Sequence, residues 1–114
     1  MMTTGLQTIV YPVTDLVKAK SVYGALFGSE PTADTPYYVG YRVAGQDIGL
    51  DPNGHKKGMT GPIGYWTVDD IDKQLATLVE AGAEVTQQPT NVGGGKLIAT
   101  VEDADGNVFG LMQP

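Results

Sequence analysis

Residues 13–18 read Val-Thr-Asp-Leu-Val-Lys, and residues 68–73 read Val-Asp-Asp-Ile-Asp-Lys. The two stretches share the pattern Val-x-Asp-(Leu/Ile)-x-Lys at an offset of 55 residues. An apolar, β-rich segment precedes each stretch, and an Asp followed by apolar residues at helical spacing is typical of a helix start. The chain therefore repeats a strand-to-helix junction, which indicates two copies of one module.

A second pair of similar stretches lies later in each copy. Residues 45–50 read Gly-Gln-Asp-Ile-Gly-Leu and residues 106–111 read Gly-Asn-Val-Phe-Gly-Leu, at an offset of 61. Two repeats are too few for a solenoid, which needs roughly three or more. We therefore expect a single pseudo-symmetric domain over residues 1–114, with module 1 at about 5–54 and module 2 at about 60–114.

Hydrophobic periodicity predicts the same order of elements in both modules. In the first module we expect a strand at 6–13, a helix capped by Thr14 or Asp15 and ended by Gly28, and strands at 37–43 and 46–51. The apolar face of this helix consists of Leu16, Ala19, Tyr23, Leu26 and Phe27.

In the second module we expect a strand at 63–68 and a helix capped by Asp69 or Asp70 and ended by Gly82. An extended segment follows at 84–92, and Pro89 within it favours an edge position. A hairpin is expected at 96–102 and 107–112 around Asp-Ala-Asp-Gly. The apolar face of the second helix consists of Ile71, Leu75 and Leu78.

Composition excludes several classes of function. There is no cysteine, which excludes disulfides, thiolate metal sites and cysteine catalysis. The net charge is −6, and from residue 58 onward only Lys73 and Lys96 oppose eight acidic residues. Because binding to phosphates needs clustered Lys and Arg, we expect no nucleic-acid partner. With neither a membrane-spanning apolar run nor a signal-like start, we expect a cytoplasmic protein without a membrane partner.

Two βαβββ modules, each opened by Val-x-Asp-(Leu/Ile), resemble the vicinal oxygen chelate superfamily, which includes glyoxalase I, bleomycin resistance proteins and extradiol dioxygenases. The resemblance rests on residues 13–16 with Tyr-Gly-Ala-Leu-Phe-Gly at 23–28, on residues 68–71 with Ala-Gly-Ala at 81–83, and on Asp-Ala-Asp-Gly-Asn at 103–107. It covers nearly the whole chain. It implies an α+β fold in which two βαβββ modules form a curved mixed sheet.

The resemblance also implies where a metal would be held. Metalloenzymes of this family take ligands from the first and last strands of each module, at positions that correspond to Thr8, Gly49, Ile63 and Gly110. Divalent metals need three or four nitrogen or oxygen donors, which these residues do not supply. We therefore expect neither a bound metal nor another cofactor.

Strand alternation sorts the remaining side chains by face, because residues two apart share a side. Taking the family's ligand positions as markers of the concave face, the predicted ligand-binding cleft consists of Thr8, Val10, Tyr38, Arg42, Asp47, Asp51, Ile63, Tyr65, Ile98, Thr100, Glu102 and Met112. The opposite, helix-packing face consists of Ile9, Tyr11, Val13, Tyr37, Val39, Tyr41, Ile48, Leu50, Trp66, Val68, Leu97, Val101, Phe109 and Leu111.

Individual residues leave alternatives open. Trp66 is expected to be a buried core residue rather than a stacking residue, whereas Tyr65 suits either a cleft or a dimer interface. Tyr38 with Arg42 suits an aromatic or anionic group, or an ordinary exposed strand pair. The carboxylates of Asp47, Asp51 and Glu102 could attract a cation, act as a base, or simply be solvated. His55 is the only histidine and lies in a turn-rich loop, which favours a surface position, so no catalytic residue is assigned.

The first functional hypothesis is a metal-free small-molecule-binding protein similar to the bleomycin-resistance branch, which sequesters an antibiotic or another aromatic compound in a cleft of a homodimer. The second is a lyase, isomerase or dioxygenase-like enzyme of the same superfamily, and the third is a structural or regulatory module without a ligand. Polar and aromatic groups on one sheet face favour the first over the third. The missing metal ligands favour the first over the second.

Overall fold

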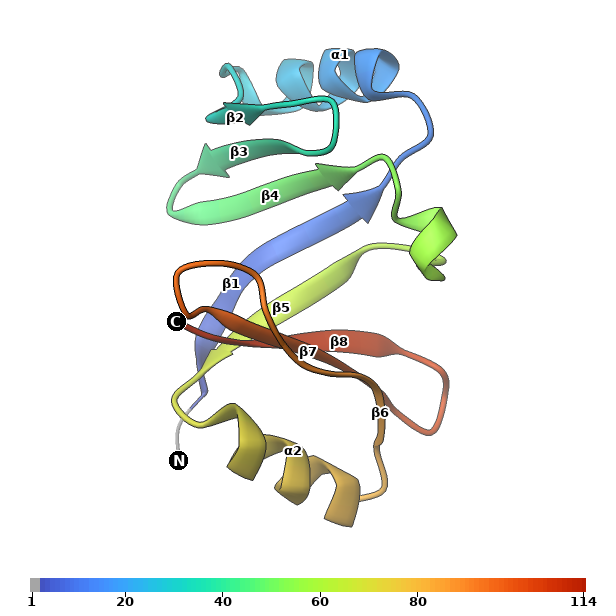
Figure 1. Ribbon diagram of the computed structural model, residues 1–114. Coiled ribbons are helices and arrows are strands. Elements are labelled where there is room, and N and C mark those ends of the chain that lie inside the picture. The colour runs from blue at the N-terminus through green and yellow to red at the C-terminus, as the bar shows by residue number, and fades with distance from the viewer. Residues whose placement is uncertain (1–2) are drawn as a thin grey trace. The chain divides into compact units, whose positions relative to one another are not determined.

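The computed structural model of the chain describes residues 3–114 and has an α+β architecture (Figure 1). The chain separates into two compact units, here called the N-terminal unit, Thr8–Ile63, and the C-terminal unit, Gly64–Pro114 with the start of the first strand. The predicted fold class of two βαβββ modules is confirmed. The elements, in chain order, are β1 (Thr3–Pro12), α1 (Leu16–Phe27), β2 (Ala33–Asp34), β3 (Val39–Val43), β4 (Gln46–Asp51), the short 3-10 helix His55–Lys57, β5 (Ile63–Val68), α2 (Ile71–Glu80), β6 (Glu84–Asn91), β7 (Leu97–Glu102) and β8 (Val108–Gln113).

In the N-terminal unit the strands are hydrogen-bonded in the order β2-β3-β4-β1. Strand β1 runs parallel to β4, whereas β3 is antiparallel to β4. The turn between β3 and β4 has positive φ at both Ala44 (50°) and Gly45 (83°), a combination that suits the twist of a tight hairpin. The two-residue strand β2 was not predicted from the sequence.

Helix α1 begins and ends as its sequence predicts. Of the two candidate caps, Asp15 is used: its carboxylate accepts a hydrogen bond from the Lys18 amide at 3.1 Å. Gly28 ends the helix with φ 65°, a left-handed conformation that favours glycine.

The core of the N-terminal unit lies between α1 and one face of the strands. Its buried members are Val39, Tyr41, Ile48 and Leu50. Aromatic rings of Tyr11, Tyr23, Phe27 and Tyr41 form a chain of neighbours with centroid distances of 5.0, 6.0 and 5.1 Å. Such pairs add about 0.5–1.5 kcal/mol each beyond burial.

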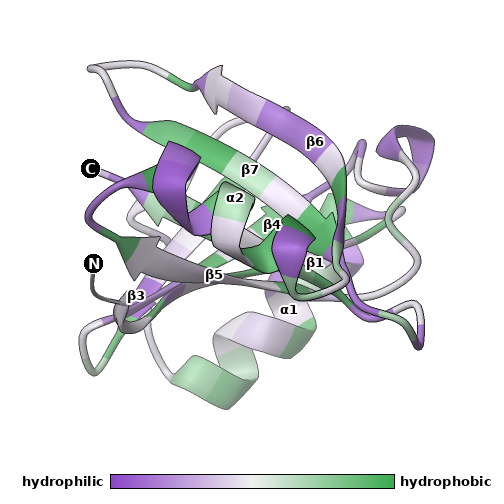
Figure 2. Ribbon diagram, turned by 90° about the horizontal axis from the view of Figure 1, so that it is seen from below, coloured by the Kyte–Doolittle hydropathy of each residue, from purple (hydrophilic) through white to green (hydrophobic). Residues whose placement is uncertain are grey.

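In the C-terminal unit the order is β5-β8-β7-β6, with β5 parallel to β8 and the other pairs antiparallel. The edge position expected for the segment with Pro89 is confirmed, and the β6–β7 register shifts twice along the pair. Figure 2 shows β6 as mostly hydrophilic and β7 as mostly hydrophobic. The buried core beneath α2 consists of Val68, Ile71, Leu75, Ala99, Val101 and Leu111.

Side-chain hydrogen bonds stabilise the C-terminal unit at two places, the start of α2 and the β7–β8 turn. Asp70, the cap used for α2, accepts from the Lys73 amide at 3.1 Å, and the Gln113 side chain accepts from the Ile71 amide at 2.8 Å. In the β7–β8 hairpin the Asp103 carboxylate accepts from both the side chain and the amide of Asn107, each at 2.9 Å. These hydrogen bonds lower the pKa of Asp103, so the charged carboxylate is the form that fits the turn.

Three expectations about burial are wrong. Leu26, predicted on the packing face of the first helix, is 73 % exposed, because it lies on the side of α1 turned away from the strands. Tyr37 is 75 % exposed because it precedes β3 and does not share that strand's alternation. Trp66 pairs with Leu111 and so lies on the predicted face, but it is 41 % exposed. Alternation selects the face of a strand residue, not how far the helix extends over it.

Within residues 3–114 no helix is long and apolar enough to cross a membrane.

Trp66 is the only tryptophan, which makes its fluorescence a direct test of its environment. We expect red-shifted emission that acrylamide quenches efficiently, because the side chain is 41 % exposed. Trp66→Ala should cost about 1–2 kcal/mol, below the roughly 3–5 kcal/mol typical of a fully buried aromatic residue. As a control, Leu111→Ala at the buried cross-strand position should cost about 2–5 kcal/mol. A blue-shifted, unquenched spectrum at every protein concentration would contradict the exposed position.

Candidate functional site

In the N-terminal unit the predicted cleft residues lie on the sheet face opposite α1. The register pairs Thr8 with Asp47 and Asp47 with Arg42, and it pairs Val10 with Gly49. Since cross-strand partners share a face, all of these side chains point away from the core beneath the helix. The face assignment derived from alternation is therefore reproduced by the register of this unit.

Arg42 and Asp47 form an ion pair across β3 and β4. The Arg42 Nη1 atom donates to Asp47 Oδ1 at 2.7 Å, and both side chains are well exposed. Exposed pairs of this kind contribute only about 0–1 kcal/mol to stability. A guanidinium has five N–H donors, so most of its hydrogen-bonding capacity remains directed to solvent or to an anionic group.

Tyr38 lies over Gly49 on this same face. A Cβ atom at Gly49 would overlap the Tyr38 hydroxyl and would lie 2.5 Å from its Cζ. Only glycine therefore leaves room for the ring. Thr35 fixes the backbone beneath this ring, because its hydroxyl accepts from the Tyr38 amide and donates to the Tyr38 carbonyl, both at 3.0 Å. The Tyr38 side chain is 37 % exposed, so part of the ring remains open to solvent.

The predicted carboxylate Asp51 is held by the loop that follows it. Its residue is 8 % exposed, and its two oxygens accept from the Asn53 amide at 2.8 Å and from Lys57 Nζ at 3.0 Å. Both oxygens thus order the segment around the 3-10 helix His55–Lys57. His55 in that helix is exposed, as the turn-rich loop predicts.

In the C-terminal unit the remaining predicted residues share one face of β5, β7 and β8. The register pairs Tyr65 and Thr100 with Gly110, and Ile98 with Met112. Glu102 pairs with Val108 on the same side. All of them point away from the core beneath α2, as predicted. Ile63 is 7 % exposed and is the last residue of the N-terminal unit.

Thr100 has a partner that sequence reasoning missed. Its hydroxyl lies 2.7 Å from that of Thr86 on β6, and Thr100 is 7 % exposed. Alternation did not assign a face to Thr86, which lies within the register shift between Val85 and Gln87. Each hydroxyl gives the other a hydrogen-bond partner, so the buried Thr100 hydroxyl is an uncharged polar group that is already hydrogen-bonded.

Tyr65 likewise lies over Gly110, but with the Cδ1–Cε1 edge of its ring, whereas Tyr38 covers Gly49 with its hydroxyl end. A Cβ atom at Gly110 would overlap the ring and would lie 2.7 Å from Tyr65 Cγ. Cross-strand coverage of a glycine by an aromatic ring is a recognised way to stabilise β-sheets. Each unit therefore places a tyrosine ring over the glycine of its Gly-x-x-apolar-Gly-Leu stretch.

The two tyrosine–glycine contacts determine whether a metal ion could be held at the ligand positions that the family resemblance implies. A carboxylate at Gly49 or Gly110 would have to displace a tyrosine ring, and Ile63 offers no donor atom. Among residues 3–114 no group of three or more His, Cys, Asp or Glu side chains is placed to hold a metal ion. The residues at the family's ligand positions do not fit a divalent metal.

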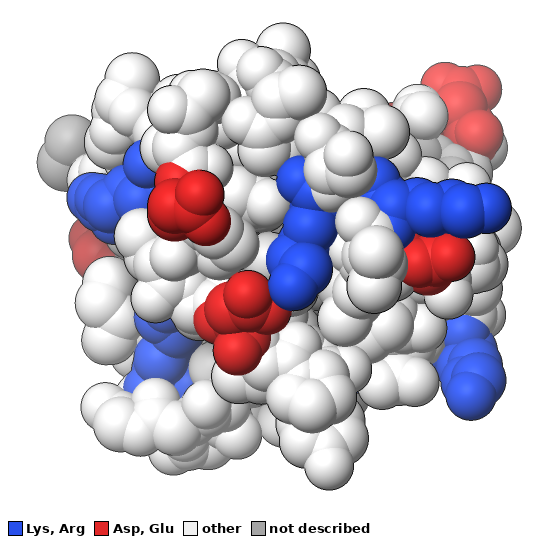
Figure 3. Space-filling view, turned by 90° about the horizontal axis from the view of Figure 1, so that it is seen from above, with Lys and Arg blue, Asp and Glu red and all other residues white. Residues whose placement is uncertain are grey.

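Charged side chains are mixed in sign on the face drawn in Figure 3. Lysine and arginine side chains lie beside aspartate and glutamate there. The expectation that the protein has no nucleic-acid partner stays a prediction.

Known proteins share both the sequence pattern and the fold. The model of the Glyoxalase/Bleomycin resistance protein/Dioxygenase superfamily matches residues 5–111. None of the functionally curated proteins matches the chain in sequence. A glyoxalase/bleomycin resistance protein/dioxygenase superfamily member from Vibrio splendidus 12B01 is similar in structure, with a TM-score of 0.75, 18 % identity, and coverage of 96 % of this chain and 100 % of the other.

Two further solved structures carry functional names. The methylmalonyl-CoA epimerase from Mycobacterium tuberculosis has a TM-score of 0.72 and 18 % identity, over 98 % of this chain and 89 % of the other. An NAD-dependent benzaldehyde dehydrogenase from Legionella pneumophila has a TM-score of 0.74 and 15 % identity, over 93 % and 96 %. At such identities the likeness shows the fold alone. Because the family model spans almost the entire sequence, the chain belongs to the glyoxalase/bleomycin resistance protein/dioxygenase superfamily.

Proposed function

We propose that this protein binds a planar or amphipathic small molecule, such as an antibiotic or another aromatic compound, without a divalent metal and without altering it. The observation that carries the proposal is the tyrosine ring over a glycine in each unit, Tyr38 on Gly49 and Tyr65 on Gly110. These rings lie where metalloenzymes of the family place a carboxylate ligand, so the exchange replaces a metal donor with an aromatic surface.

The surroundings of each ring support the same conclusion. Around Tyr38 the exposed Arg42–Asp47 pair supplies charge that can orient a polar substituent. Around Tyr65 the neighbours on its face are Ile98, which is partly exposed, and Thr100 and Met112, which are buried at 7 % and 5 % exposure beside the Thr86–Thr100 hydroxyl pair. Ligand sites are commonly of this kind, mostly apolar with a few placed polar groups.

The first prediction concerns ligand binding. A thermal-shift screen of aromatic natural products, antibiotics and flavins should yield a compound that raises the melting temperature. At a hundred times its Kd such a ligand stabilises the fold by about 2.7 kcal/mol. Tyr38→Ala or Tyr65→Ala should weaken binding by about 0.5–1.5 kcal/mol, the contribution of one aromatic contact.

Tyr37→Ala is the matched control for Tyr38→Ala, because Tyr37 is the adjacent residue and is 75 % exposed. This variant should bind the hit like the unsubstituted protein. Mass spectrometry of the compound after incubation distinguishes binding from catalysis, and recovery of an altered compound would replace the proposal by an enzyme of the lyase, isomerase or dioxygenase type. A hit insensitive to both tyrosine substitutions would reject the proposed site.

The second prediction concerns metal content. Elemental analysis of the purified, dialysed protein should find zinc, nickel, iron and manganese far below one ion per chain. Gly110→Glu, which restores the family's carboxylate, should not increase metal content and should destabilise the fold by about 1–3 kcal/mol, because the new side chain displaces the Tyr65 ring. Gly61→Glu is the control, since a Cβ at Gly61 meets nothing within 4 Å. A stoichiometric metal in the unsubstituted protein would refute the metal-free proposal.

The third prediction is that the protein forms a homodimer. Light scattering coupled to size-exclusion chromatography should report about twice the chain mass of 12.0 kDa at micromolar concentration. Exposed apolar side chains such as Val22, Leu26 and Val79 give the chain a surface that association would bury. A mass of one chain at every concentration tested would show that the protein is a monomer.

A further inference from the structure

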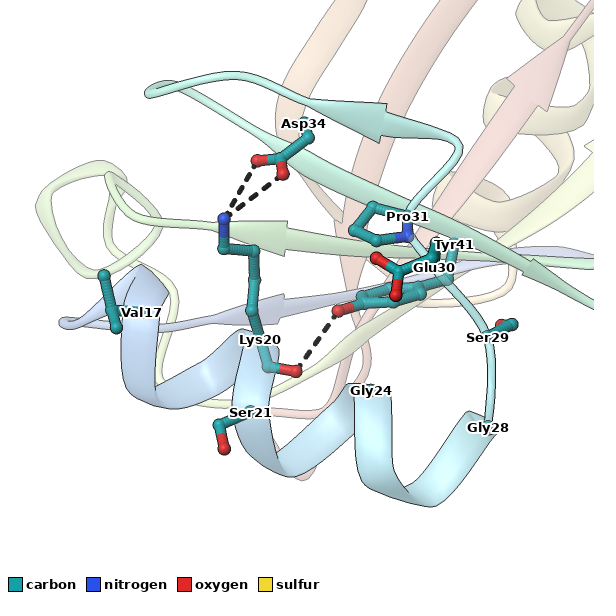
Figure 4. A pocket seen from close by; sticks show the side chains of 10 residues that line it. All are labelled: Val17, Lys20, Ser21, Gly24, Gly28, Ser29, Glu30, Pro31, Asp34 and Tyr41. Carbon is teal, nitrogen blue, oxygen red and sulfur yellow. Dashed lines mark hydrogen bonds and ion pairs between the residues drawn. The ribbon is translucent and has the colours of Figure 1, made fainter.

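A hollow on the helix side of the N-terminal unit contains none of the predicted cleft residues. It has a volume of about 540 Å³ and lies between α1 and the segment that connects α1 to β2 (Figure 4). Tyr41 of β3 borders it, on the strand face opposite to that of Arg42. The hollow is therefore separate from the face on which Tyr38 lies. Its lining consists of Val17, Lys20, Ser21, Gly24, Gly28, Ser29, Glu30, Pro31, Asp34 and Tyr41.

The Tyr41 hydroxyl offers a hydrogen-bond acceptor to this hollow. Its residue is 2 % exposed, and the hydroxyl donates to the Lys20 carbonyl at 3.4 Å. Burial raises the pKa of Tyr41, and the nearby Asp34 and Glu30 carboxylates act in the same direction while Lys20 opposes them. The phenol therefore stays protonated at neutral pH. Because the Tyr41 hydroxyl donates its proton in the hydrogen bond to the Lys20 carbonyl, the lone pairs of the hydroxyl oxygen remain available to accept a hydrogen bond from a ligand.

The charged groups around the hollow leave one carboxylate unused. Lys20 Nζ lies 3.2 Å from both oxygens of Asp34, which forms an ion pair at the rim. No hydrogen bond or ion pair within residues 3–114 engages the Glu30 carboxylate. Figure 4 shows this carboxylate and the Tyr41 hydroxyl on the same side of the hollow. Two carboxylates thus face one ammonium group, and the exposed Glu30 carboxylate and the Tyr41 oxygen are both hydrogen-bond acceptors.

Gly24 keeps the wall of the hollow open. It lies inside α1, where glycine lowers helix stability relative to alanine. A Cβ atom there would meet Tyr41 Oη at 3.7 Å, an ordinary contact, so no clash requires glycine at this position. Alanine would instead place a methyl group beside the hydroxyl and narrow the space.

We propose that this hollow is a binding site for a small molecule that carries a primary ammonium group. The ammonium group donates hydrogen bonds to the Glu30 carboxylate and the Tyr41 oxygen, and the attached apolar part lies against Pro31, which Figure 4 shows beside them. An anion is disfavoured because the net charge of the lining side chains is negative. A neutral molecule forgoes the charge-assisted hydrogen bond to Glu30.

The test uses the full chain and n-butylammonium chloride as the probe, with sodium butyrate and n-butanol as the anionic and neutral comparisons. Backbone amide chemical shifts are recorded by NMR during each titration. We expect saturable shifts with n-butylammonium at Lys20, Gly24, Glu30 and Asp34, and at most small, unsaturated shifts with the other two compounds.

Three variants separate a ligand site from general effects. Glu30→Gln removes one charge at constant size and should weaken binding about three- to tenfold. Glu80→Gln makes the same change on α2 in the C-terminal unit and should leave the Kd unchanged. Gly24→Ala should raise the melting temperature and yet weaken binding, a combination that a purely structural glycine would not give.

Two results would overturn the proposal. One is the absence of saturable shifts with n-butylammonium, or equal shifts with butyrate or butanol. The other is an unchanged Kd in both Glu30→Gln and Gly24→Ala. Since both variants alter exposed or helical positions outside the buried core, their folding can be verified by their amide spectra.

Discussion

In each unit one helix covers one face of the strands, and the side chains beneath it are among the most deeply buried of residues 3–114. Val39 and Leu50 in the N-terminal unit, like Val101 and Ala99 in the C-terminal unit, are fully buried. Burying a side chain of the size of Leu50 contributes about 1.5–3 kcal/mol. Because strand side chains alternate, this packing commits every second residue to the core. The intervening residues are left for the opposite face, where binding residues can be placed at little cost to the core.

The use of that opposite face explains the two tyrosine–glycine pairs. A glycine within a strand normally weakens it, because it has no side chain to pack. At Gly49 and Gly110 the missing side chain is replaced by a ring from a neighbouring strand or strand entry. The ring covers the backbone at the position where the resemblance to metalloenzymes of the family implies a metal ligand. Each tyrosine ring thus supplies packing over a glycine on the strand face opposite the helix.

Helix α1 differs from α2 in how its surface is used. α2 has two fully or nearly buried residues, Ile71 and Leu75, and a polar outer side, whereas α1 has no buried residue and exposes Val17, Val22 and Leu26. Its glycine and serine positions adjoin the hollow bordered by Tyr41. This hollow lies between α1 and the segment that follows it. That space is absent from any description based on strand faces alone.

The sequence by itself determined the repeated junction, the order of the elements, the Asp and Gly residues that begin and end α1, and the face of almost every strand residue. These features depend on local propensity and on side-chain alternation, which are encoded within a few neighbouring residues. Tertiary structure decided how far each side chain is buried and which distant residues contact one another, because both depend on which residues meet across strands. It left Trp66, Leu26 and Tyr37 exposed, engaged both oxygens of Asp51 in a loop, and paired Thr86 with Thr100 across shifted strands. It also laid the Tyr38 and Tyr65 rings over glycines, since contact between residues far apart in the chain cannot be read from spacing alone.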